Sequence, residues 1–147
     1  MAAKNTEELE NELSSSTDIK KYLSVNEEER KDLTLSEYLN ELLTVKKLNK
    51  AEVIKNSLLE KTYAYHIFAG RKKNPSRKKA LALALAMKLS RKETQHLLYY
   101  AGCRELYVRN LWDSVIFYGL EHGYSVMDTN FLLETVGEKS LFDSEAD

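Results

Sequence analysis

Residues 48–76 read LNKAEVIKNSLLEKTYAYHIFAGRKKNPS, and this stretch decides the fold. Asn49 is placed to cap a short helix that ends near Ser57, because an asparagine side chain can accept a hydrogen bond from the first helical turn. A second helix is expected over residues 60–69, since its apolar residues recur one turn apart. Gly70 ends that helix, because glycine readily adopts the left-handed conformation found after helix ends. The stretch therefore predicts two short helices joined by a tight turn.

The flanking sequence predicts further helices. A single proline and 5 glycines leave too few turn residues for an all-β fold. Thr34 and Glu37 form a capping box ahead of an apolar face with helical spacing. Residues 80–87 are apolar on nearly every side, which is typical of a helix in the middle of a core. The other expected helices cover residues 35–47, residues 76–88, the segment between Ser90 and Gly102, residues 108–122, and the segment between Ser125 and Gly137.

The chain is expected to have three parts. Residues 1–33 form an acidic, mostly flexible arm with short helices near residues 6–13 and 18–23. Residues 34–102 form the core domain, and residues 103–147 form a C-terminal helical extension with a short acidic tail. This extension is a helical hairpin with a surplus of apolar positions. They could pack on the core or form a dimer interface, and both alternatives stay open.

The charges are distributed unevenly along the chain. Its 147 residues include 22 basic and 23 acidic side chains, for a net charge of −1. Residues 46–92 hold 14 basic and 2 acidic side chains, a surplus of +12, so the rest of the chain is strongly acidic. A basic segment between acidic flanks favours a polyanion as partner. The alternative is a solvated lysine-rich surface.

Other classes of protein find little support. Cys103 has no second cysteine to pair with, and the N-terminal residues MAAKNTEELE lack the apolar run of a signal peptide, so a cytoplasmic protein is expected. The longest apolar run is too short to span a membrane. His66, His96 and His122 do not have the spacing of metal ligands. Without a phosphate-binding glycine loop or a nucleophile motif, neither a cofactor nor an enzyme activity is expected.

The stretch from Leu48 resembles the helix-turn-helix of the λ repressor and Cro-like (Xre-type) DNA-binding proteins. The features that carry the resemblance are an apolar-capped second helix followed by Tyr63, Ala64, Ile67, Gly70 and Asn74-Pro75-Ser76. The resemblance covers about residues 35–101, less than half of the chain. It implies an all-α fold with a five-helix helix-turn-helix core, with the hairpin outside the family pattern, and double-stranded DNA as the partner.

Counted from the helix over residues 35–47, the helix over residues 60–69 is the third of the core. The family pattern makes this third helix the one that enters the major groove. Lys61 and Thr62 are then expected at its leading end, and the loop after the helix passes beside backbone phosphates. The residues implied to contact DNA are Lys50, Lys61, Thr62, Tyr65, His66, Arg71, Lys72 and Lys73.

The chain departs from the family pattern at two single positions, in its aromatic third helix, and in the loop after Gly70, which is one residue longer than the commonest form. Leu58 stands in the turn where many members have glycine. Either this leucine is left-handed, at a cost of about 1 kcal/mol, or the turn differs. Glu60 stands at the N-cap of the third helix, where Ser, Thr or Asp is usual. A carboxylate there suits the helix dipole but repels DNA phosphate.

A DNA-binding transcriptional regulator is the leading functional hypothesis. The alternative hypothesis is a protein–protein adaptor that keeps the fold without specific DNA binding. It is suggested by Leu58, the aromatic third helix and the apolar hairpin. Residues 14–17, Ser-Ser-Ser-Thr, could also accept phosphate, so that the acidic arm folds over the basic segment. A homodimer and a regulatory protein partner are compatible with either hypothesis.

Overall fold

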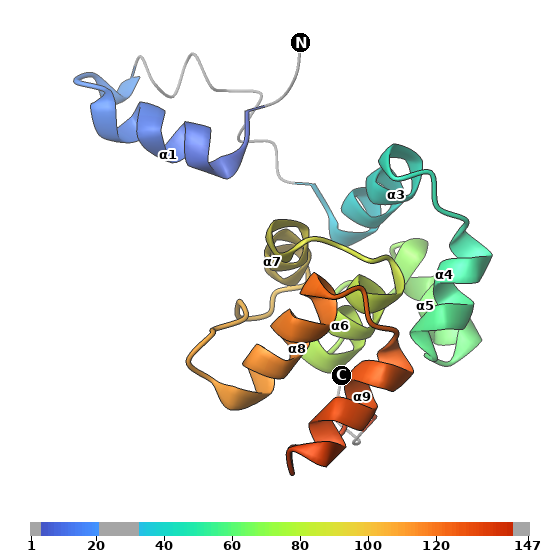
Figure 1. Ribbon diagram of the computed structural model, residues 1–147. Coiled ribbons are helices and arrows are strands. Elements are labelled where there is room, and N and C mark those ends of the chain that lie inside the picture. Colours follow the sequence, from blue (N-terminus) through green and yellow to red (C-terminus); the bar gives the residue numbers. More distant parts are fainter. Residues whose placement is uncertain (1–3, 21–32, 143–147) are drawn as a thin grey trace. The chain divides into compact units, whose positions relative to one another are not determined.

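The computed structural model describes residues 4–20 and 33–142, and these contain α-helices and no strand (Figure 1). The all-helical fold is therefore confirmed for the described part of the chain. Its helices are α1 (Thr6–Ser15), α3 (Leu35–Val45), α4 (Lys50–Ser57), α5 (Lys61–Phe68), α6 (Arg77–Ala86), α7 (Arg91–Tyr100), α8 (Leu111–Glu121) and α9 (Val126–Thr135). The short helix expected near residues 18–23 falls largely outside the described residues. No described helix is both long and apolar enough to cross a membrane.

The chain divides into two compact units, residues 1–32 and 33–147. In the first unit, α1 begins at a capping box in which the Asn5 side chain accepts a hydrogen bond from the backbone of Glu8 at 2.7 Å. Lys4 and Glu12 form an ion pair at 2.6 Å. No residue of α1 is buried, so this helix depends on capping and charge pairs rather than on a core.

The helices of residues 33–142 begin at polar side chains that accept a hydrogen bond from the first turn. The capping residues are Thr34, Asn49, Glu60, Ser76, Ser90, Asn110 and Ser125. Asn110 accepts from the backbone of Asp113 at 3.0 Å, so α8 begins at Leu111. The start expected at residue 108 is therefore wrong, because the cap lies later in the chain.

Helix α6 lies in the middle of the second unit. Residues 80–85 are each at most 2% exposed, so the helix is buried on nearly all sides, as its apolar sequence predicts. Helices α4, α7, α8 and α9 all pack on α6, while α3 packs on α5 and α7 (Figure 1). The hairpin of α8 and α9 therefore packs on the core, which is one of the two alternatives left open by the sequence.

The turn between α4 and α5 contains a strained leucine. Leu58 has φ 61° and ψ 12°, which is the left-handed conformation, so the first alternative for this turn is correct. The side chain of Ser57 is completely buried and forms hydrogen bonds with backbone groups on either side of it in the chain. Its hydroxyl donates to the Ile54 carbonyl at 2.6 Å and accepts from the Leu59 backbone at 3.2 Å. The cost of the left-handed leucine is about 1 kcal/mol.

Helices α8 and α9 cross at a glycine. A Cβ atom added to Gly119 would lie 2.6 Å from Oγ1 and 3.1 Å from Cγ2 of Thr129. Thr129 is completely buried, and its hydroxyl has no hydrogen-bond partner among the described residues. The absence of a side chain at position 119 is therefore what allows the two helices to approach.

A second contact fastens the hairpin to the core. The guanidinium of Arg77, at the start of α6, donates to both carboxylate oxygens of Asp113 on α8, at 3.0 and 2.9 Å. It also donates to the carbonyls of Arg104 and Glu105, at 3.0 and 2.9 Å. The side chain of Asp113 is 1% exposed and that of Arg77 is 14% exposed. The backbone N–H of Tyr107 also donates to Asp113, at 2.8 Å, so both oxygens of the buried carboxylate accept hydrogen bonds.

Replacing Gly119 by alanine should destabilise the protein by about 1–3 kcal/mol, because the new methyl group overpacks the crossing of α8 and α9. Urea denaturation measures the loss. The matched control is the double variant Gly119→Ala, Thr129→Ala, which removes both close atoms and should recover much of the stability. Equal stabilities for wild type and Gly119→Ala would contradict the crossing described above.

Replacing Arg77 by alanine should cost about 3–5 kcal/mol of unfolding free energy, because the Asp113 carboxylate would remain buried without its counter-charge. The comparison is Arg91→Ala, which breaks the Arg91–Glu121 pair, whose two side chains are about half exposed. Exposed pairs contribute little, so thermal melting should show a much larger drop for the Arg77 variant. Similar drops would show that burial of the Arg77 pair is not what matters.

Candidate nucleic-acid interface

Helix α5 has one buried face and one accessible face. Ala64, Ile67 and Phe68 are buried in the core. The opposite face carries the four residues that the family resemblance assigned to this helix, namely Lys61, Thr62, Tyr65 and His66. The first three are exposed and His66 is half-buried. Successive helical residues are about 100° apart, so the four share one arc of the surface.

The start of α5 is held by Glu60. Its carboxylate accepts a hydrogen bond from the backbone of Tyr63 at 2.6 Å. This carboxylate therefore serves as the N-cap that the sequence indicated, and its negative charge lies near the positive end of the helix dipole.

One edge of the accessible face is lined by Lys50. This residue opens α4, and its Nζ atom lies 5.6 Å from the centre of the Phe68 ring. A cation this close to an aromatic face is attracted by the ring electrons. The contact therefore brings Lys50 to α5, although 10 residues or more separate it from the exposed positions of that helix.

The other edge is lined by cations around Tyr63. Lys72 has its Nζ atom 5.5 Å from the centre of the Tyr63 ring, and Lys79 has its Nζ atom 4.4 Å from it. The loop after α5 is tied back to this helix, because the backbone N–H groups of Arg71 and Lys72 donate to the His66 carbonyl at 2.9 and 3.2 Å. This loop also carries Lys73. Arg71 and Lys73 are both exposed.

Not every cation of the basic segment lies at α5. Arg77 is engaged by Asp113, and three others have partners on α7, on α8 or in the turn after α8. Lys46 pairs with Glu93 at 3.0 Å, Arg91 pairs with Glu121 at 3.2 Å, and Lys88 donates to the Gly123 carbonyl at 2.7 Å. The surplus of +12 therefore overstates the charge available near α5.

The Lys46–Glu93 pair is an example of a basic side chain that is held by a partner within the protein. Burial raises the pKa of the Glu93 carboxyl, but hydrogen bonds from the Ser90 backbone and from Lys46 outweigh burial and lower the pKa below its ordinary value. The lysine is thus held by an ionised carboxylate at the start of α7, and its charge is largely neutralised there.

Sequence reasoning missed two residues of this surface. In the sequence, Tyr63 stands out only as a feature of the family resemblance, and Lys79 is only one charge of the basic segment. Lys79 belongs to α6, so its position beside Tyr63 of α5 follows from the tertiary fold and not from its neighbours in sequence.

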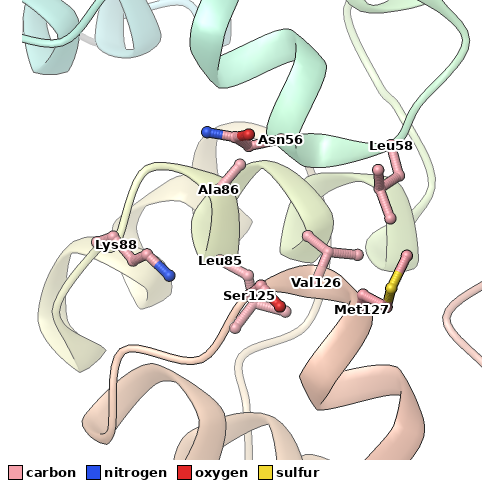
Figure 2. A pocket seen from close by; sticks show the side chains of 8 residues that line it. All are labelled: Asn56, Leu58, Leu85, Ala86, Lys88, Ser125, Val126 and Met127. Atoms are coloured by element: carbon pink, nitrogen blue, oxygen red, sulfur yellow. The ribbon is translucent and has the colours of Figure 1, made fainter.

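We also considered metal-binding clusters and pockets among the described residues as candidate sites. No group of three or more metal-binding side chains occurs among the described residues. A pocket of about 300 Å³ lies where the ends of α4 and α6 meet the start of α9. Figure 2 shows its lining side chains, which are Asn56, Leu58, Leu85, Ala86, Lys88, Ser125, Val126 and Met127. The ammonium of Lys88 is already bound to the Gly123 carbonyl, so this mostly apolar pocket presents no evident catalytic group.

Comparison of the chain with protein-family models, with curated proteins and with solved structures found no significant match.

Proposed function

We propose that the protein binds double-stranded DNA through a helix-turn-helix formed by α4 and α5, within a five-helix core of α3 to α7, and that it acts as a transcriptional regulator. The observation that carries the proposal is the accessible face of α5, which has lysines along both of its edges.

The dimensions of DNA suit this arrangement. The major groove is about 12 Å wide and admits one α-helix, and a backbone of phosphates borders the groove on each side. A helix lying in the groove needs cations at its two edges, where Lys50 and Lys72 lie. It needs hydrogen-bonding side chains on the face between them, where Lys61 and Thr62 are exposed.

The exposed face of α5 favours backbone contacts over base contacts. Lys61 and His66 can donate to base acceptors, and the Thr62 methyl group can contact a thymine. Of the residue types that make the usual bidentate base contacts, α5 contains Lys61 but no arginine, asparagine or glutamine. Affinity should therefore come mainly from phosphate contacts, and these make binding strongly dependent on salt.

A second candidate function is protein binding through the hairpin. Met127 and Phe131 of α9 are 65% and 69% exposed. Exposed apolar side chains of this size on one helix suit a contact with another protein. This candidate corresponds to the adaptor hypothesis, and it predicts no affinity for DNA.

The decisive measurement is a fluorescence-anisotropy titration with random-sequence duplex DNA at several salt concentrations. Replacing Lys61, Lys72 and Lys73 together by alanine should weaken binding and reduce the slope of log affinity against log salt by about 2–3, close to 0.9 for each lost phosphate contact. The matched control is the triple variant Lys92→Ala, Arg109→Ala, Lys139→Ala, which removes the same charge at exposed positions outside α4, α5 and the loop between α5 and α6. Its slope should stay near that of the wild type.

Equal slopes for the two triple variants would show that net charge alone causes the binding. Absence of wild-type binding even at about 50 mM salt would exclude the DNA-binding proposal, because phosphate contacts are strongest at low salt. The adaptor function would then be the better supported candidate.

A further inference from the structure

A contact between Lys79 and Tyr63 joins the first turn of α6 to α5. Lys79 lies in the first turn of α6, where its backbone N–H donates to the Ser76 cap at 3.3 Å. Its ammonium lies 4.4 Å from the centre of the half-buried Tyr63 ring, nearer than that of Lys72 at 5.5 Å. The base of this side chain is thus fixed by a helix start, and its charged end is held near a ring.

Tyr63 lies at one edge of the accessible face of α5. At about 100° per residue, Phe68 and Tyr63 bracket the arc that holds the accessible residues of α5. Lys50 lies against Phe68 at one end of the arc, and Lys79 lies against Tyr63 at the other end. The two lysines therefore border opposite edges of the same exposed face.

We propose that Lys79 contacts a DNA phosphate on the opposite strand from the phosphate contacted by Lys50, and that Tyr63 is its positioning residue. The inference rests on the proposed DNA-binding function and adds to it. A free lysine side chain loses rotamer freedom when it binds a phosphate. Attraction to the ring face restricts Lys79 before binding, so less of that entropy remains to be lost on DNA.

The experiment measures the salt dependence of duplex-DNA affinity for single variants of the full chain. Lys79→Ala should lower the log–log slope by about 0.9. Between 50 and 200 mM salt the variant should therefore lose about threefold less affinity than the wild type loses. The control is Lys92→Ala on α7, which packs on α3, α6 and α8. Its slope should be unchanged.

The role of Tyr63 is tested with two substitutions. Tyr63→Leu removes the ring and should lower the slope, whereas Tyr63→Phe keeps the ring and should retain most of the slope. In the Lys79→Ala background, Tyr63→Leu should have a smaller effect than it has in the wild type, because residues that act together are not additive. Melting temperatures measured in parallel separate this effect from loss of fold, since a purely structural contact changes stability without changing the salt slope of the folded protein.

Two outcomes overturn the inference in distinguishable ways. If the wild type binds DNA and Lys50→Ala lowers the slope while Lys79→Ala does not, Lys79 is not a phosphate contact and the proposed function survives. If the wild type does not bind duplex DNA at low salt, the inference falls together with the proposed function.

Discussion

The burial of α6 is the constraint on which the rest of the second unit depends. A helix that is apolar on nearly every side must be covered on every side, and α4, α7, α8 and α9 supply that cover. The polar first turn of α6 emerges from this cover, with Arg77 reaching α8 and Lys79 reaching α5. A single buried helix thus positions both the hairpin and one edge of the candidate interface.

The basic segment consists of two groups of cations with different surroundings. Arg77 lies beside a carboxylate that is 1% exposed, and a charge in that position is required by the fold, because removing it would leave a buried anion. Lys50 and Lys72 lie on aromatic rings, which attract cations without neutralising them. The surplus of basic residues pointed towards an anionic partner, but only the three-dimensional arrangement separates the cations near α5 from those that hold the fold together.

Much of the fold could be predicted from the sequence because its determinants are local. Caps such as Thr34 and Ser90 act over three residues, and helical spacing acts over one or two turns. The expected start of α8 lies too early in the chain, because the apolar Val108 precedes the Asn110 cap. The Arg77–Asp113 pair joins residues 36 positions apart, and the Lys79–Tyr63 contact joins two helices. No periodicity within one segment carries such information, so the place of Lys79 beside Tyr63 could not be predicted from the sequence.

Glu60 bears on the DNA binding proposed for this face of α5. Its carboxylate accepts a hydrogen bond from the backbone of Tyr63, so part of its charge is balanced by the helix start and its repulsion of a nearby phosphate is reduced. The same hydrogen bond fixes the first turn of α5, which carries Lys61 and Thr62. An acidic cap is therefore compatible with a helix that approaches DNA, provided that the lysines at both edges outweigh the remaining negative charge. Since few side chains on the accessible face suit base recognition, those lysines and the loop after α5 would supply most of the affinity, and sequence preference would be modest.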